Sequence, residues 1–348
     1  MTGADRVVAF GPGRVNLIGE HTDYNDGLSL PFAIEDGVTV TATAIAGEHV
    51  EALARDLGEE DAFALAAPGR AHGWRAFVRG VVAELRADGL PVRAARLEIT
   101  GTLARGSGLS SSAALEVALC LALLGITGAD GDADRPALAR LCSRVENDWV
   151  GANTGLLDQT AALLGREGQA LRIDFRGLHV TPVPLDLGDW RLATIDSGEA
   201  HSHAASGYNE RRAECAEACE RLGIATLRDA RADALRDLPA VLARRVRHVL
   251  DENARVERTV AALRDGDLAA VGRLLDASHA SLRDLYDAST DAVERTVAAM
   301  LAAGAAGARM VGGGFGGHVL ALLPPGVDVP AAATVVAPGA GARVRQRG

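Results

Sequence analysis

The chain has no lysine, and all 36 of its basic residues are therefore arginine. Two widespread folds for phosphoryl transfer depend on a lysine, because the P-loop needs it beside the phosphates and protein kinases need it on a strand. The sequence excludes both folds. If this chain binds a nucleotide, the site has to be built from backbone amides, arginine side chains and a metal ion.

At 348 residues with 48% hydrophobic content, the chain is long enough for two domains of ordinary size or for one large domain. Its formal net charge of -10 argues against a nucleic-acid partner, because phosphate contacts require a basic surface. The most continuous apolar segment, Val117–Ile126, is far shorter than the roughly 20 residues of a membrane-spanning helix. We therefore expect no nucleic-acid partner and no membrane association.

Four cysteines are too few for a disulfide scaffold in a chain of this length, and residues 1–5 carry no secretory signal. Both observations favour a cytoplasmic protein with reduced thiols. Cys215 and Cys219 are four residues apart on a predicted helix, which suits either a metal pair or one semi-buried helical face. No histidine or cysteine accompanies them at zinc-ligand spacing, so we expect no structural metal.

Hydrophobic periodicity predicts a mixed α+β order without internal repeats. Gly11-Pro12-Gly13 is expected to end the opening strand. We expect one domain over residues 1–180 and a second over residues 181–348, where charge density rises. Strands are predicted at Arg6–Phe10, Gly37–Ala44, Arg96–Thr100, Leu171–Phe175 and Val319–Leu323, and helices at Trp74–Asp88, Glu210–Leu222 and Leu242–Leu275, with a largely helical stretch over Asp134–Leu164 that breaks at Gly151–Gly155.

A glycine- and serine-rich segment, Gly106–Ser112, lies between a predicted strand and a predicted helix. Small residues let the backbone approach a ligand closely, and the free amides and positive dipole end of the helix favour an anion. A serine hydroxyl is also a suitable hard ligand for Mg²⁺. The segment is thus a candidate phosphate loop, and ordinary helix capping with tight packing is the alternative.

A second polar cluster follows the first strand, where Arg14–Asn25 concentrates arginine, asparagine, glutamate, histidine and aspartate within twelve residues. Such side chains both donate and accept hydrogen bonds, as the hydroxyls of a sugar require. A sugar or another polar ligand is therefore the favoured interpretation, and a charged turn is the alternative.

Asp158 is flanked by apolar residues, where burial would raise its pKa unless a cation pairs with it. Because the chain lacks lysine, that partner has to be arginine or a metal, and Arg14 is our candidate. The alternative for Asp158 is a helix N-cap. A further glycine run, Gly312–Gly317, suits either a phosphate contact or a tightly packed turn. His201 and His203 have no third ligand placed with them, and we assign them to a loop.

Three segments, in this order, resemble the signatures of the GHMP small-molecule kinases. They are Gly13–Asn25, Gly108–Leu115 and Gly312–Gly317. The first contains Gly-Glu-His-Thr-Asp-Tyr, which resembles the galactokinase branch of that family and differs from the mevalonate and homoserine kinases. The resemblance extends over nearly the whole chain and includes Gly155–Gln159, Gly207-Tyr208 and Ser281–Asp284.

The resemblance implies an α+β fold of two domains, the first ribosomal-protein-like and the second ferredoxin-like, with the active site in the cleft. It implies ATP-dependent phosphorylation of the anomeric hydroxyl of D-galactose, which yields galactose 1-phosphate and ADP and is the first committed step of galactose catabolism. The expected partners are galactose, ATP and Mg²⁺, and the expected state is a monomer. Alternatives are a related sugar-1-kinase for N-acetylgalactosamine or arabinose, and a non-catalytic galactose sensor.

By the same resemblance, Asp158 is the carboxylate beside the attacking hydroxyl, and Arg14 keeps it ionised and stabilises the transferring charge. The remaining implied contacts form three groups. The sugar hydroxyls would meet Glu20, His21, Asp23, Gly155 and Tyr208; ATP would meet Gly106, Ser107, Gly108, Leu109, Ser110, Ser111 and Ser112; and Mg²⁺ would meet Ser112 and Glu146.

The sequence departs from the family pattern at two places. Thr102–Arg105 replaces a short apolar and proline lead-in, which puts Arg105 close to the expected nucleotide site. Leu285 stands where the family has a second acidic residue. Neither position belongs to the catalytic set.

Overall fold

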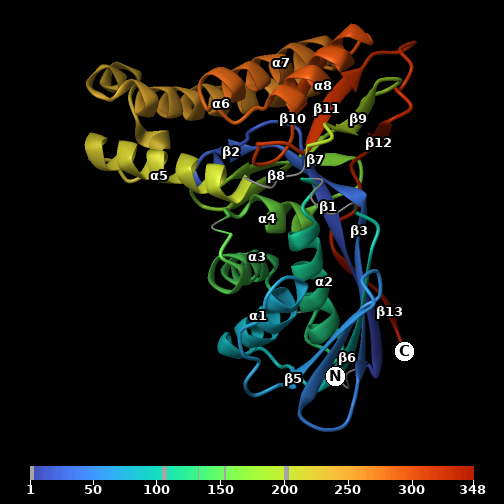
Figure 1. Cartoon of the computed structure of the whole chain (residues 1–348). Helices are drawn as coiled ribbons and strands as arrows, with labels where there is room; N and C mark the ends of the chain where they lie inside the picture. The colour runs from blue at the N-terminus through green and yellow to red at the C-terminus, as the bar shows by residue number, and fades with distance from the viewer. Residues whose placement is uncertain (1–3, 104–107, 132, 153, 200–203) are drawn as a thin grey trace.

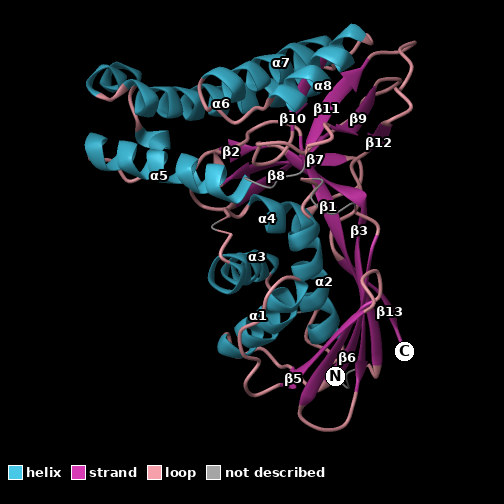
Figure 2. Ribbon diagram, in the orientation of Figure 1, coloured by secondary structure: helices cyan, strands magenta, loops and turns pink. Residues whose placement is uncertain are grey.

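The computed structural model describes residues 4–103, 108–131, 133–152, 154–199 and 204–348. These residues form three sheets and several long helices, which confirms the predicted α+β class (Figures 1 and 2). None of the helices in these ranges is both long enough and apolar enough to cross a membrane.

The largest sheet has six strands in the order β13-β1-β3-β6-β4-β5. Helix α2 packs on β1 and β3, and every residue of α2 from Ala113 to Gly125 is buried. The strands are β1 (Arg6–Asn16), β3 (Pro31–Ala44), β4 (His49–Ala54), β5 (Glu59–Ala64), β6 (Ala95–Gly101) and β13 (Arg343–Arg347), and the helices beside this sheet are α1 (Trp74–Ala87), α2 (Ser111–Gly125), α3 (Arg135–Arg144) and α4 (Leu157–Leu164).

The other two sheets lie at the opposite end of the molecule, where helices α5 to α8 gather (Figure 1). Their strand orders are β10-β11-β9-β12 and β2-β7-β8. The strands are β2 (Leu28–Ser29), β7 (Gln169–Asp174), β8 (His179–Pro184), β9 (Arg191–Asp196), β10 (Gly307–Met310), β11 (His318–Leu323) and β12 (Ala333–Val336), and the helices are α5 (Ala204–Leu222), α6 (Ala240–Arg264), α7 (Leu268–Asp284) and α8 (Asp291–Ala302).

Strand β13 pairs with β1, so the end of the chain returns to the sheet in which it began. The division into residues 1–180 and 181–348 stays a prediction. Short helical turns complete the elements at η1 (Asp23–Asn25), η2 (Val145–Val150), η3 (Leu227–Asp229) and η4 (Ala232–Asp237).

The prediction that Gly11-Pro12-Gly13 ends the first strand is wrong. Strand β1 continues to Asn16, and its register against β3 shifts between Pro12 and Arg14. Glycine is needed at position 11 for a different reason, because a Cβ there would lie 2.1 Å from the carbonyl oxygen of Ala114 in α2. The segment therefore brings the strand against the start of α2 instead of stopping it.

The helical stretch predicted over Asp134–Leu164 is confirmed, with its break before α4. Helix α3 passes at Val145 into a π-helical turn that ends at Gly151. Such turns are rare and often occur at functional sites, because they change the direction in which one side chain projects. Here the π-helical turn carries Glu146.

Candidate active site

A cavity of about 440 Å³ lies where the three sequence motifs meet. Glycines of the third motif, Gly312–Gly314, form part of its wall. Of the predicted site residues, those that line it are Arg14, Glu20, His21, Asp23, Gly108, Ser110, Ser111, Ser112, Glu146, Gly155, Asp158 and Tyr208.

Three predicted contacts are not placed in this lining. Gly106 and Ser107 lie outside the described residues, as does Arg105. The side chain of Leu109 belongs to a buried hydrophobic cluster, and its backbone carbonyl accepts a hydrogen bond from the Arg14 amide at 3.1 Å.

Arg14 and Asp158 form a two-point ion pair at the cavity wall. The Arg14 Nε donates to Asp158 Oδ1 at 2.8 Å and Nη2 donates to Oδ2 at 2.9 Å. The hydroxyl of Ser110 also donates to Asp158. Because α4 has Leu156 as its N-cap, the N-cap interpretation of Asp158 is wrong, and the predicted pairing with Arg14 is observed.

The serine segment leads into the N-terminus of α2 beside this ion pair. Ser110 has a left-handed backbone (φ 62°), which is uncommon and costly for a residue other than glycine. His21 (φ 61°) and Phe315 (φ 60°) share this conformation, so each of the three motifs contains one such residue. Strained backbone held in this way suits a pre-formed ligand site.

Glu146 lies next to the serine segment and is only 4% exposed. Its carboxylate accepts hydrogen bonds from Ser112 and Thr154, and from Gln159 Nε2 at 2.8 Å. Burial, together with the negative charge of Asp158, raises the pKa of Glu146. A cation beside these oxygens would relieve both effects.

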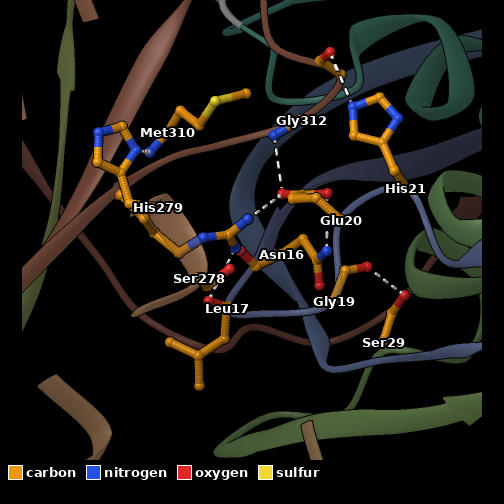
Figure 3. Close-up of polar contacts among 12 residues, drawn as sticks. Asn16, Leu17, Gly19, Glu20, His21, Ser29, Ser278, His279, Met310 and Gly312 are labelled. Atoms are coloured by element: carbon orange, nitrogen blue, oxygen red, sulfur yellow. Dashed lines mark hydrogen bonds and ion pairs between the residues drawn. The ribbon is translucent and has the colours of Figure 1, made fainter. Parts of the chain in front are cut away.

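Glu20 occupies the other end of the cavity and is held from three sides (Figure 3). The Gly312 amide donates to its Oε1 at 2.9 Å, and Asn16 Nδ2 donates to its Oε2 at 2.9 Å. The guanidinium of Arg309 lies 3.3 Å from Oε1. Burial raises the pKa of Glu20, although Arg309 and Arg14 oppose the increase.

His21 packs among tyrosine rings beside Glu20. Its ring centroid lies 5.3 Å from that of Tyr208 and 4.6 Å from that of Tyr286. Burial lowers the pKa of His21 to about 3, so the ring is neutral at physiological pH. A neutral imidazole has one donor and one acceptor nitrogen.

Asp23 packs directly against Gly155 at the cavity wall. A Cβ at position 155 would lie 1.9 Å from Asp23 Oδ2, so no larger residue fits while this aspartate keeps its place. Burial, and then the charge of Asp158, raise the pKa of Asp23 to about 6. The cavity thus holds a carboxylate that is costly to ionise without a ligand.

We predict that Asp23→Asn stabilises the ligand-free protein at pH 7.5 by about 1–2 kcal/mol, because it removes this costly charge. The native state keeps the proton of Asp23 up to about pH 6, whereas the unfolded chain releases it near 3.8. Wild-type stability therefore falls as pH rises through that window. Thermal unfolding at pH 5 and pH 7.5 measures the effect, and the advantage of the variant should be larger at pH 7.5. An equal advantage at both values would contradict the assignment.

Sequence reasoning missed Arg309 and Thr154. Arg309 is fully buried on β10, and its Nη1 donates to the carbonyls of Asn16 and Leu17 at 3.1 and 3.0 Å. The available signal was one arginine in an otherwise apolar strand, Gly307–Val311. Thr154 had no signal beyond its place in the glycine-bounded break.

Family models match three parts of the chain. The model described as the galactokinase galactose-binding signature matches residues 1–44. The models of the GHMP kinases N terminal domain and the GHMP kinases C terminal match residues 76–166 and 259–339. The matched ranges contain all three motifs that line the cavity.

Similar proteins cover nearly the whole chain. The galactokinase of Mycobacterium tuberculosis is 45% identical over 328 residues, which cover 91% of this chain and 89% of that protein. A crystal structure of Lactococcus lactis galactokinase complexed with galactose has a TM-score of 0.91 and 32% identity, covering 97% of this chain and 95% of that one. The mevalonate kinase of Methanococcus jannaschii, at a TM-score of 0.63 and 17% identity over 91% of this chain and 90% of that one, shares the fold.

Proposed function

This chain belongs to the galactokinase family of GHMP kinases, and we propose how its residues transfer the γ-phosphoryl group of ATP to the anomeric hydroxyl of galactose. The observation that carries the proposal is the Arg14–Asp158 ion pair, placed between the serine segment and the Glu20–Asp23 cluster in one cavity. A phosphate donor and a polyhydroxyl acceptor can meet there.

Asp158 is proposed to accept the proton of the anomeric hydroxyl while the oxygen of that hydroxyl forms a bond to the γ-phosphorus of ATP. The bond between that phosphorus and the bridging β,γ-oxygen breaks, and ADP leaves with the electron pair. Arg14 holds the Asp158 carboxylate through two hydrogen bonds and offsets the negative charge that develops on the phosphoryl oxygens. Most of the rate enhancement then comes from alignment and charge neutralisation.

Glu20, His21, Asp23 and Tyr208 are proposed to hold the sugar hydroxyls. The two carboxylates are acceptors, and binding a hydroxyl donor offsets part of the free-energy cost of burying their charge. Gly155 admits the sugar and Asp23 together, because position 155 carries no side chain. Recognition of hydroxyls by buried polar groups gives strong selectivity, since an analogue that lacks one leaves a partner unsatisfied.

The residues at the serine segment fit a magnesium ion. Ser112 and Glu146 supply hard oxygen ligands, and a cation bound there would offset the burial and the Asp158 charge that raise the pKa of Glu146. No cluster of three or more metal-binding side chains occurs in the described residues, so phosphate oxygens and water would complete the shell. When bound, Mg²⁺ would neutralise phosphate charge.

We predict that Glu146→Gln raises the Mg²⁺ concentration needed for half-maximal activity at least about tenfold, because the amide removes the anionic ligand. A magnesium titration at saturating galactose and ATP measures it. Glu84→Gln is the control, because Glu84 pairs with Arg144 and does not line the cavity. An unchanged requirement would remove Glu146 from the metal site.

The function is tested by ADP release with galactose, ATP and Mg²⁺, with glucose as the control sugar. Comparing kcat/KM for galactose, N-acetylgalactosamine and arabinose separates the related sugar kinases. Galactose binding without turnover would instead support the sensor. The intact serine segment and the Arg14–Asp158 pair favour the kinase.

Location and assembly complete the proposal. All four cysteines are free thiols, which suits a reducing cytoplasm. We propose a monomer, and size-exclusion chromatography with light scattering measures the oligomeric state.

A further inference from the structure

A row of hydrogen bonds runs from the cavity wall into the core. His21 Nδ1 lies 2.8 Å from the Tyr24 hydroxyl, which lies 2.9 Å from the Tyr286 hydroxyl. The Tyr286 hydroxyl lies 3.1 Å from the Cys215 sulfur, and Asn25 Nδ2 lies 3.7 Å from that sulfur. The row joins residues from the first motif, α5 and the segment after α7.

The cavity end of this row determines which way its protons point. His21 Nε2 lies 3.1 Å from the carbonyl oxygen of Gly313, and a carbonyl can only accept. Nε2 therefore carries the hydrogen. Since the ring is neutral, Nδ1 is an acceptor, and the Tyr24 hydroxyl donates to it. The Tyr24 oxygen is then left to accept from Tyr286.

The core end can complete the same direction. The Asn25 amide is oriented by its hydrogen bond to the His21 carbonyl at 2.9 Å, so Nδ2 faces the Cys215 sulfur as a donor. Because the Tyr286 hydroxyl gives its one hydrogen to Tyr24, its oxygen accepts the thiol hydrogen of Cys215. Burial raises the pKa values of Cys215, Tyr24 and Tyr286, so all three keep their hydrogens.

We propose that Tyr24 and Tyr286 are positioning residues that hold His21 in the Nε2–H tautomer, so that this side chain meets the sugar as a hydrogen-bond donor. The proposal rests on the function proposed above, and it states which nitrogen of His21 carries the hydrogen at the sugar site. An isolated neutral imidazole exchanges readily between its two tautomers. Here the Gly313 carbonyl at Nε2 and the Tyr24 hydroxyl at Nδ1 select the same one of them.

The surroundings of His21 hold its ring in the orientation that these hydrogen bonds require. Its backbone is left-handed, and the rings of Tyr24, Tyr208 and Tyr286 pack around it at centroid distances of 5.9, 5.3 and 4.6 Å. A sugar hydroxyl oxygen can therefore replace the Gly313 carbonyl as the acceptor. A ring with its hydrogen on Nδ1 would present a lone pair there instead.

The test is Tyr24→Phe, which keeps the ring and removes the hydroxyl. Nitrogen-15 NMR of the histidine side chains reports the tautomer, and a His21→Gln variant identifies the His21 signals. We expect the Nε2–H form in the wild type and a mixture in Tyr24→Phe. The galactose KM should rise about 5- to 10-fold, the effect of one hydrogen bond, with kcat and the ATP KM nearly unchanged.

Tyr286→Phe should change the same signals less, and the double variant should resemble Tyr24→Phe, because both hydroxyls act through one chain. Thr259→Val is the control, since it removes a buried hydroxyl that bonds within α6. It should leave the His21 signals and the galactose KM unchanged.

An unchanged Nε2–H signal in Tyr24→Phe, or any other wild-type tautomer, would overturn the inference. Galactose binding and NMR are measured without ATP, so they stay informative if the wild type shows no kinase activity. In that case the proposed function fails while the tautomer result still stands. If Tyr24→Phe does not fold, the wild-type spectrum and Tyr286→Phe decide.

Discussion

Replacing Asp158 with asparagine should lower kcat about 10³-fold or more, while galactose still binds. The amide cannot accept the proton of the anomeric hydroxyl, and a positioned general base contributes about 10²- to 10⁴-fold. It also leaves the Arg14 guanidinium without its anionic partner, which changes the charge around the transferring phosphoryl group. Both effects act on the transition state, so kcat should fall far more than KM rises.

The chain contains a matched control for this variant. Asp61 forms an equivalent two-point pair with Arg79, at 2.8 and 2.6 Å, away from the cavity. Asp61→Asn should therefore lose stability without losing turnover. Single-turnover kinetics and galactose calorimetry on both variants measure the difference. If Asp158→Asn kept more than about a tenth of the wild-type kcat, Asp158 would not be the central carboxylate.

Arg309→Met should lower the free energy of unfolding by about 3–5 kcal/mol, because breaking a buried ion pair leaves one charge without compensation. Arg309 lies on β10, the strand before the third motif, and it is fully buried. Its guanidinium lies 3.3 Å from the Glu20 carboxylate. Methionine preserves most of the apolar volume. The carboxylate of Glu20 would lose its ion-pair partner, and the carbonyls of Asn16 and Leu17 would lose a hydrogen-bond donor in the same step.

Urea unfolding of the ligand-free protein measures this loss. Adding Glu20→Gln to Arg309→Met should recover part of the stability, because the double variant no longer buries an unpaired carboxylate charge. Arg283→Met is the surface control, since Arg283 is 45% exposed in its side chain and pairs with Asp284, and it should cost under about 1 kcal/mol. A similar loss in both arginine variants would contradict the proposed role of Arg309.

These contacts also explain how the third glycine motif contributes. The Gly312 amide and Arg309 hold Glu20, and the Gly313 carbonyl meets His21. The motif thus shapes the sugar end of the cavity. Our sequence interpretation assigned Gly312–Gly317 either to a phosphate contact or to a packed turn, and the observed contacts favour a packing role that includes the ligand site.

Much of the site could be predicted because it is local in sequence. Arg14 to Asp23 lie within ten residues, and Gly108 to Ser112 within five, so their motifs were recognisable before any fold was known. The helix predicted over Trp74–Asp88 is observed as Trp74–Ala87, and the helical stretch predicted over Asp134–Leu164 includes the observed helix Leu157–Leu164. Apolar spacing reports which face of an element is buried, and this information is carried by neighbouring residues.

The sequence alone determined the exclusion of lysine-dependent folds, most of the main elements, the three motifs and the pairing of Asp158 with Arg14. The single helix predicted over Leu242–Leu275 is wrong, because the chain breaks after Arg264 and forms α6 and α7. Only the tertiary structure decided that β1 continues past Gly11-Pro12-Gly13, that Arg309 supports Glu20, and that Tyr286 reaches Tyr24. These depend on contacts between residues far apart in the chain, whose distances follow from strand register and helix packing. Local propensity carries no record of such long-range pairing, because the same turn or buried arginine is compatible with several neighbours until the sheets assemble.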